Sequence, residues 1–242
     1  MISEQTIQKL NQLHKIQDSY EPSLDIADKL ATKTIIMAVG ATCEGKNLVM
    51  DTASQLDERF RVVGTRTSRE PREGDDPNRY TYYQNTDEGL SGVLKAIEQH
   101  KMVQYAINPY SQLIYASTIE DYPSEYNLAD VFSSAIENFR HLGFKQATAI
   151  TIITEPAVWL ARFQERFPRK HPQRQARRDE AIESFTWSLS QEKDHFWVEN
   201  KDGDPEVAAQ ELIAIALGKS TGNPDAKQLA KASLEAAWSI VV

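Results

Sequence analysis

The sequence predicts an α/β fold with a mostly parallel sheet flanked by helices. The main observation is a pair of apolar and β-branched runs, at residues 34–39 and 147–154, which are typical of central parallel strands covered on both faces. Segments with helical spacing of apolar residues alternate with such runs, which favours parallel pairing. The length of 242 residues allows one domain of this class with small insertions.

The first half of the chain is predicted to begin with a helix, because its apolar residues recur at helical spacing. A later segment contains two prolines and a glycine among charged residues, which predicts a loop. The elements expected, in order, are a helix over 3–17, strands over 34–39 and 60–64, a loop over 65–79, a strand over 80–83, a helix over 86–98, and an antiparallel strand pair over 102–107 and 113–118.

In the second half, prolines and a glycine predict where helices begin and end. Pro156 and Pro205 each open a helix, since proline favours the first turn. Pro168 interrupts the first of these helices, and Gly218 ends the second. The elements expected, in order, are a strand over 128–132, a helix up to 142, a strand over 147–154, a helix from 156, an arginine-rich connector, a helix over 173–190, a strand over 196–198, a helix over 205–218, and a last helix over 225–239.

Composition and charge limit the function classes. The net charge of −8 argues against broad binding to nucleic acid or to membrane surfaces. No apolar stretch reaches the roughly 18 residues needed to span a bilayer, and the first residues lack the features of a signal peptide. The single cysteine, Cys43, excludes an internal disulfide framework. We therefore expect a cytoplasmic protein without a nucleic-acid or membrane partner, and the sequence leaves the oligomeric state open.

A glycine-rich loop follows the run at residues 34–39. Residues 40–46 read Gly-Ala-Thr-Cys-Glu-Gly-Lys, which is the spacing Gly-x4-Gly-Lys, and a helix-compatible segment comes next. In a phosphate-binding loop (P-loop), glycines let backbone N–H groups turn toward an anion and the lysine begins a helix. The loop therefore predicts a fold of the P-loop NTPase type. The alternative is an ordinary strand–turn–helix connection with incidental glycines.

Arginines are concentrated in two short segments, whereas lysines are scattered. Twelve of the thirteen arginines lie within residues 59–79 and 159–178. The planar fork of arginine binds phosphate oxygens in a bidentate way, while lysine acts as a point charge. Two arginine clusters and a P-loop together indicate a site that holds several phosphates. The alternative is that the arginines decorate solvated helix faces.

The segment 67–75 resembles the GMP-binding signature of the guanylate kinase family. It reads Thr-Ser-Arg-Glu-Pro-Arg-Glu-Gly-Asp and is followed by Tyr80, where the family has Thr-Thr-Arg-x-x-Arg-x-Gly-Glu and a tyrosine several residues on. The resemblance covers about residues 34–217. Further positions that look like the family pattern are residues 115–118, Arg162, Arg166, Arg177 and residues 198–200.

This resemblance implies ATP-dependent phosphorylation of a nucleoside monophosphate, with GMP converted to GDP. Small-molecule nucleotides would be the partners, and ATP and Mg²⁺ the cofactors. A guanylate kinase-like domain would span 32–218, with a β-rich monophosphate-binding insertion at about 65–118 and a helical lid at about 166–178. Residues 1–31 would form an N-terminal helical extension, and residues 219–242 a C-terminal linker and helix.

The resemblance also implies roles for individual residues. The catalytic residues would be Lys46, Arg162, Arg166 and Arg177. ATP would be bound by Gly40, Ala41, Thr42, Cys43, Glu44, Gly45, Lys46, Asn47, Leu48 and Asn200. The monophosphate would be bound by Thr65, Arg69, Arg72, Tyr80, Gln104, Tyr115, Ser117 and Asp130. Asn47 would contact Mg²⁺.

Three positions depart from the family pattern. Asn47 replaces the usual serine or threonine after the lysine, and its amide oxygen is a legitimate magnesium ligand on a longer side chain. Gln104 stands where the family has a glutamate that accepts two guanine N–H groups, a mismatch of about 1–3 kcal/mol if buried. The Asp-x-Asp motif of the family is not recognisable, and Asp130 is its nearest candidate.

These departures leave two alternatives open. One is a kinase for a phosphorylated ribose on the same scaffold. The other is a catalytically silent module that binds a protein or phosphopeptide through Arg69 and Arg72. Each functional residue also has a plain structural interpretation. The arginines could pair with neighbouring carboxylates such as Asp75, and Tyr80 and Tyr115 could be half-buried strand residues.

Overall fold

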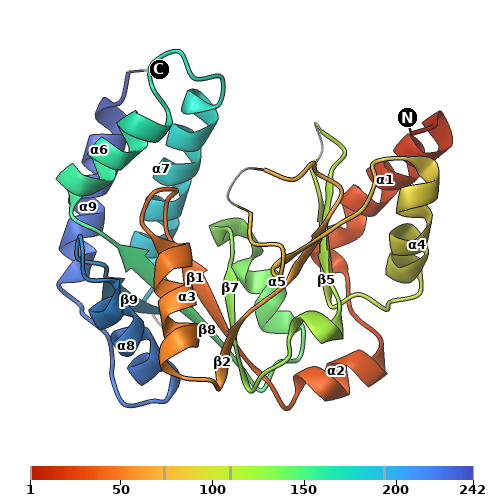
Figure 1. The fold of residues 1–242 in the computed structure, drawn as a ribbon, viewed down its shortest axis with the longest axis horizontal. Coiled ribbons are helices and arrows are strands. Elements are labelled where there is room, and N and C mark those ends of the chain that lie inside the picture. The colour runs from red at the N-terminus through yellow and green to blue at the C-terminus, as the bar shows by residue number, and fades with distance from the viewer. Residues whose placement is uncertain (1, 73–74, 109–110, 193–194, 242) are drawn as a thin grey trace. The chain divides into compact units, whose positions relative to one another are not determined.

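The structure is a computed structural model that describes residues 2–72, 75–108, 111–192 and 195–241. The chain divides into two compact units. The helices and strands of both are labelled in Figure 1. Unit 1 comprises Met1–Thr34, Arg61–Asn127 and Glu137–Gln146, and unit 2 comprises Ile35–Phe60, Leu128–Ile136 and Ala147–Val242. Four strands of the larger sheet, β1, β2, β7 and β8, each have residues assigned to both units.

The larger sheet is five-stranded and parallel, which confirms the predicted fold class. Every residue of its central strand β1 is buried, as expected for a strand covered on both faces. Its neighbour β8 continues in parallel to β9, with Ala149 opposite His195. The strand order is β2-β7-β1-β8-β9, with β1 at Thr34–Val39, β2 at Phe60–Val62, β7 at Tyr126–Asp130, β8 at Gln146–Ile153 and β9 at His195–Glu199.

The helices of unit 2 pack in two groups. Helix α3 packs on α8, while α9 packs on α6 and α7. An aromatic core that includes Trp159, Phe163 and Phe185 lies in the second group, and the rings contact one another at 5.2–5.6 Å between centroids. The helices span Lys46–Leu56 (α3), Pro156–Arg166 (α6), Arg174–Ser190 (α7), Pro205–Ala216 (α8) and Ala226–Ser239 (α9). The predicted helix starts at Pro156 and Pro205 are confirmed.

Unit 1 contains a second sheet of four strands in the order β4-β3-β6-β5. The antiparallel pair predicted over 102–107 and 113–118 is confirmed as β5 and β6. Helix α1, from Glu4 to Ile16, contributes Leu10 and Leu13 to the same apolar core as α4. The bounds are Thr65–Thr67 (β3), Tyr80–Tyr82 (β4), Gln104–Ile107 (β5), Ile114–Ser117 (β6), Leu24–Leu30 (α2), Asp87–Glu98 (α4) and Ile136–His141 (α5).

Two predictions of local structure were wrong. The loop expected over 65–79 begins with strand β3, because Thr65 and Thr67 carry β-branched side chains and the strand pairs with both β4 and β6. The strand expected over 128–132 ends at Asp130 and is followed by a short 3₁₀ helix, Ser133–Ala135. Similar short helices lie at Gln17–Ser19 and Ile119–Asp121.

No helix in the described part of the chain is both long enough and apolar enough to cross a membrane.

Candidate functional site

The glycines of the predicted P-loop are required by its conformation. Gly40 has a φ of +144°, and a Cβ atom there would lie 2.6 Å from the carbonyl oxygen of Ile152. Gly45 has a φ of +82°, and a Cβ atom there would collide with Nδ2 of Asn200. Both glycines therefore allow a backbone path that L side chains would block. The path leads directly into α3, whose N-terminus is a favourable place for an anion.

Lys46, the first residue of α3, lies over the loop. Its Nζ donates to the carbonyl oxygens of Gly40 at 2.5 Å and Ala41 at 3.1 Å, and it lies 3.6 Å from Oδ1 of Asp130. The Lys46 side chain is only 10% exposed. Two of these three partners are neutral carbonyl groups, so a phosphate would offer the ammonium group a stronger, charged partner.

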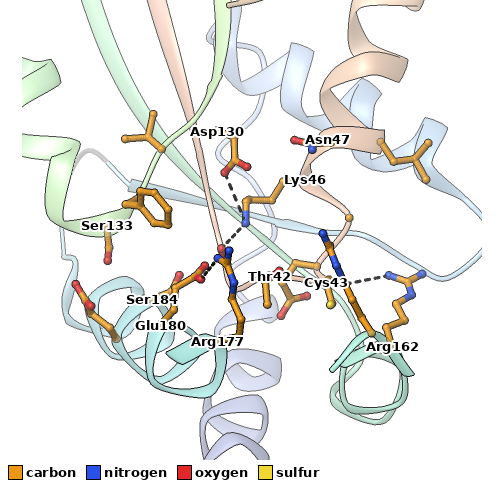
Figure 2. A pocket seen from close by; sticks show the side chains of 18 of the residues that line it. Thr42, Cys43, Lys46, Asn47, Asp130, Ser133, Arg162, Arg177, Glu180 and Ser184 are labelled. Carbon is orange, nitrogen blue, oxygen red and sulfur yellow. Dashed lines mark hydrogen bonds and ion pairs between the residues drawn. The ribbon is translucent and has the colours of Figure 1, made fainter. Parts of the chain in front are cut away.

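A cavity of about 630 Å³ opens in unit 2 above this lysine, within the size range of small-molecule sites. Its walls come from the P-loop, the end of β7, α6 and α7. Figure 2 shows Lys46 close to Asp130, with Arg162 and Arg177 reaching toward the cavity from their helices. The four cationic residues that line it are those predicted to be catalytic: Lys46, Arg162, Arg166 and Arg177.

The arginines of the cavity are held by exchangeable contacts. Arg162 forms an ion pair with Asp202 and reaches the Cys43 carbonyl oxygen at 3.5 Å. Arg177 donates to Glu180 at 2.6 Å. Both side chains are about 30% exposed, at 33% and 28%. Partly exposed ion pairs contribute about 0–1 kcal/mol, so these arginines can turn to a phosphate at little cost.

Glu44 is the unusual residue of the loop. It is fully buried, and its Oε2 accepts a hydrogen bond from the backbone N–H of Thr154 at 2.6 Å. Its Oε1 has no partner among the described residues. Burial raises the pKa of the Glu44 carboxyl to about 8, against smaller opposing effects from Thr154 and Lys46. Glu44 is therefore mostly neutral at pH 7, and its side chain does not carry a full negative charge in the loop.

Two further loop predictions concern Cys43 and Asn200. Burial raises the pKa of the Cys43 thiol, so the residue lacks the thiolate character of a reactive cysteine. Asn200 is buried, and its Nδ2 donates to the Glu44 carbonyl oxygen at 2.8 Å. Its backbone N–H donates to Ile153 at 2.7 Å. Asn200 therefore stabilises the backbone of the loop through its hydrogen bond to Glu44. A direct contact between Asn200 and ATP stays a prediction.

Asp130 lies beside Lys46 rather than among the other predicted monophosphate-binding residues, which belong to unit 1. It is the last residue of β7, the strand next to β1, so the ends of these parallel strands bring it to the P-loop. Its side chain is 42% exposed and lines the cavity. This position would suit a residue that binds the phosphoryl donor, ATP. The contact of Asp130 with the monophosphate stays a prediction.

Asp130 and Asn47 both line the cavity and offer one carboxylate and one amide oxygen. Among the described residues, no group of three or more acidic, histidine or cysteine side chains could hold a metal ion by itself. Mg²⁺ usually keeps several waters and takes one or two carboxylates plus substrate phosphates. The two side chains therefore fit a magnesium ion that arrives with a nucleotide.

In unit 1, one of the two predicted monophosphate-binding arginines, Arg69, is paired with a carboxylate. The guanidinium of Arg69 makes two parallel hydrogen bonds to Asp75, at 2.7 and 2.8 Å, and lies 4.7 Å from the Tyr80 ring centroid. Tyr82 also donates to Asp75, at 2.6 Å. These contacts, above all that with Arg69, hold the pKa of the Asp75 carboxyl well below its usual range. The sequence leaves open that Arg69 could simply pair with a neighbouring carboxylate, and the structure contains this pair.

The remaining predicted residues of unit 1 lie on its sheet or next to it. Arg72 is exposed, and its backbone N–H donates to Asp75. The Ser117 hydroxyl lies 2.8 Å from the hydroxyl of Tyr122. The strand register sets Thr65 opposite Tyr80, Thr67 opposite Tyr115, and Gln104 opposite Ser117. Glu73 and Gly74 of the family-like motif lie outside the described residues.

Sequence reasoning missed one wall of the cavity. Helix α7 contributes Glu180 and Ser184 together with Arg177, and the connection after β7 contributes Phe132 and Ser133. The three α7 residues are spaced i, i+3 and i+7, which is one face of a helix, and this spacing could have revealed them. Phe132 is 65% exposed, so nothing in the apolar pattern of a strand would have assigned it to a site.

Comparisons with known proteins add little to this picture. No family model and no curated protein sequence matches the chain. The chain is similar to a crystal structure of guanylate kinase from Anaplasma phagocytophilum, with 12% sequence identity and a TM-score of 0.48. The match covers 88% of this chain and 98% of that chain. A functional assignment therefore has to rest on the residues of the site.

Proposed function

We propose that the protein transfers a phosphoryl group from ATP to a nucleoside monophosphate, with GMP as the first acceptor to test. One observation carries the proposal: the P-loop lysine and three arginines from α6 and α7 line a single cavity. Cations from three chain segments that converge on one cavity suit a ligand with several phosphates.

The chemistry of phosphoryl transfer explains why such cations are needed. The donor and the acceptor are both anions, and the charge on the transferred group is spread over its oxygens in the transition state. Catalysis therefore consists mainly of positioning and electrostatic stabilisation. In the proposed reaction, Lys46 and the start of α3 hold the β- and γ-phosphates, while Arg162, Arg166 and Arg177 stabilise the transferred group.

Two further residues complete the proposed donor site. Asp130 and Asn47 would hold Mg²⁺, which neutralises phosphate charge when it is bound. Glu44 stays mostly neutral beneath the loop, so it does not repel the triphosphate at neutral pH. Asn200 and Thr154 keep Glu44 and the loop backbone in place.

The acceptor would be bound by residues of unit 1. Because Arg69 is paired with Asp75, we assign the acceptor phosphate to Arg72, which is exposed, and to the hydroxyl group of Tyr80. Arg69 then orders the loop that presents Arg72, since the Arg72 N–H is bound to the same Asp75 carboxylate. Gln104 would face the base.

A second candidate is a kinase that acts on a phosphorylated ribose. Gln104 favours it, because the neutral amide offers one acceptor and one donor where guanine presents two donors. The side chain is half-buried on β5, so the mismatch would not be fully relieved by water. The donor site would be the same in both cases.

A coupled assay that detects ADP tests the proposal. The purified protein is incubated with ATP and Mg²⁺ and with one acceptor at a time from a panel of GMP, AMP, CMP, UMP and ribose phosphates. Turnover with GMP or another nucleoside monophosphate is the expected result. Turnover with a ribose phosphate alone would support the second candidate. A silent panel, with the folded protein verified by circular dichroism, would contradict both and favour a binding module.

A further inference from the structure

The arginines of the segment 162–178 fall into two sets with different partners. Arg162, Arg166 and Arg177 line the cavity. Arg174 and Arg178, on the same helix as Arg177, instead bind backbone carbonyl groups of the residues that follow α9. The arginine-rich segment is thus both a wall of the site and an attachment point for another part of the chain.

Arg174 makes the central contacts of this attachment. Its side chain is buried, at 6% exposed, and its guanidinium donates to two carbonyl oxygens: Nε to Val241 at 2.9 Å, and Nη1 to Phe167. The guanidinium also lies 5.6 Å from the Phe163 ring centroid. Phe167 directly follows α6, so one side chain of α7 ties together the end of α6, the start of α7 and the residues after α9.

Helix α9 is built to lie close to α6 and α7. Its buried residues Ala226, Ala230, Ser233 and Ala237 are spaced by four, three and four positions, which places them on one helical face. Small side chains on this face allow a close approach, and α9 packs along both helices (Figure 1). Ile240 follows at 5% exposure, in the same apolar core as Phe163 and Phe167. Because Ile240 is buried, it fixes the positions of two backbone carbonyl groups: that of Val241, which Arg174 binds, and its own, which Arg178 binds.

We propose that Arg174, Phe167, Ile240 and Val241 form a clasp that fixes the connection between α6 and α7, and that Arg174 is a positioning residue for the cavity arginines. The proposal rests on the proposed function only for its kinetic consequence. Arg162 and Arg166 lie on the helix before the connection and Arg177 on the helix after it. Their relative positions therefore depend on the geometry of the connection that the clasp holds.

The physical consequence concerns how the arginines reach the phosphates. A segment at residues 166–178 that closed only on binding would lose conformational entropy in each catalytic cycle. A clasped segment has its arginines in place beforehand, which is the preorganisation that electrostatic catalysis requires. Residues 205–241 would then serve the site through α9 although none of them lines the cavity.

Hydrogen exchange of the full-length protein tests the clasp without reference to activity. Arg174→Lys keeps the positive charge but lacks the planar fork that spans two carbonyl groups. Ile240→Ala removes the apolar anchor and leaves Arg174 intact. Both variants should exchange the amides of residues 167–178 at least about tenfold faster than the wild type. The amides of β1 and β8 should be unchanged. Arg169→Ala, an exposed arginine of the same connection, is the matched control and should exchange like the wild type.

Steady-state kinetics then separate positioning from simple support of the fold. For both clasp variants we expect kcat about tenfold lower or more, with the KM for ATP changed much less, because misplaced arginines cost transition-state stabilisation. Wild-type exchange at 167–178 in both variants would overturn the clasp, whether or not the protein is a kinase. Faster local exchange with unchanged kcat in an active enzyme would overturn the positioning role. If Arg174→Lys unfolds globally, Ile240→Ala decides by the same criteria.

Discussion

Two regions of the molecule have arginines that the sequence assigns to phosphate binding, and they differ in what those arginines contact. In unit 2, Arg162 and Arg177 line a cavity and form single, partly exposed ion pairs. In unit 1, Arg69 is buried and makes a bidentate pair with Asp75, which Tyr82 also binds. The arginines of unit 2 can exchange their carboxylate partners for a ligand. Arg69 of unit 1 is instead held in an ion pair within its own loop.

This difference shows that the type of residue alone does not decide whether a cation is available. Asp75 stands six positions after Arg69, and its carboxylate fits the guanidinium fork. In this loop, which resembles a phosphate-binding motif, the arginine is therefore bound by a carboxylate of the same loop. In unit 2 the carboxylates Glu180 and Asp202 each engage an arginine that remains about 30% exposed.

The largest expected effect is that of Lys46→Ala. Removing the ammonium group from the P-loop should lower kcat/KM with ATP at least about 1,000-fold, because a preorganised charge at the phosphates would be lost. A coupled ADP assay measures it, and circular dichroism checks the fold. Lys29→Ala, an exposed lysine paired with Asp25 on α2, is the control and should keep full activity. Normal rates in Lys46→Ala would mean that the cavity of unit 2 does not bind the phosphoryl donor.

Glu44 should make stability depend on pH in an unusual direction. Its pKa is raised to about 8 in the folded protein, whereas the unfolded chain has the ordinary value near 4.5. Between these values the folded state holds a proton that the unfolded state releases, so stability is greatest below pH 4.5 and falls as pH rises toward 8. This single group lowers the unfolding free energy by at most about 1.4 kcal/mol per pH unit.

Glu44→Gln tests this slope, since the amide is neutral at every pH. Urea denaturation of both proteins between pH 5 and pH 9 should give a wild-type unfolding free energy that declines relative to the variant and levels off above about pH 8. Parallel curves would mean that Glu44 is ionised in the folded protein and that the loop carries a buried negative charge.

Asp75→Asn tests the closed ion pair of unit 1. The variant should lose about 1–2 kcal/mol of unfolding free energy at pH 7, because it leaves Arg69 without a charged partner. The pKa of Asp75 is lowered in the folded protein, so the wild type has this advantage above about pH 4 and loses it as pH falls further. Asp76→Asn, at an exposed neighbour, should change stability by less than about 0.5 kcal/mol.

Asp75→Asn also tests whether Arg69 can bind the acceptor phosphate. If Arg69 only orders the loop, freeing it from Asp75 should leave the KM for GMP the same or raise it. A clearly lower KM would show that Arg69 can bind the acceptor phosphate and that Asp75 normally blocks it.

The smallest expected effect is that of Asn47→Ser. A hydroxyl group after the P-loop lysine is shorter than the amide and suits Mg²⁺ held by a nucleotide, so kcat should rise by about two- to fivefold. The rise should grow as the magnesium concentration is lowered. A fall in kcat would instead show that the Asn47 amide makes a contact that serine cannot replace.

Much of the fold could be predicted because local patterns agreed with the tertiary structure. The buried strand before Gly40 and the helices opened by Pro156 and Pro205 follow from apolar runs and backbone chemistry that act over a few residues. Strand β3 was missed because its pairing with β4 and β6 comes from distant segments, while the prolines that follow it dominate the local pattern.

The candidate site could be predicted only where a motif named its residues. The Gly-x4-Gly-Lys spacing identified Lys46, and the resemblance to the guanylate kinase family singled out Arg162, Arg166 and Arg177 from the six arginines of their cluster. The burial of Glu44 depends on its contact with Thr154, which is 110 positions away, so no local pattern could reveal its raised pKa. The proximity of Asp130 to Lys46 likewise arises from the order of the strands.

If the cavity of unit 2 binds ATP for phosphoryl transfer to a nucleoside monophosphate, ³¹P NMR of a single reaction mixture will show the transfer. With ATP, Mg²⁺, GMP and the purified protein, we expect ADP and GDP to appear in equal amounts without free phosphate, and neither to appear with Lys46→Ala. Unchanged ATP, or release of inorganic phosphate without GDP, with no other nucleoside monophosphate phosphorylated in GMP's place, would contradict the account.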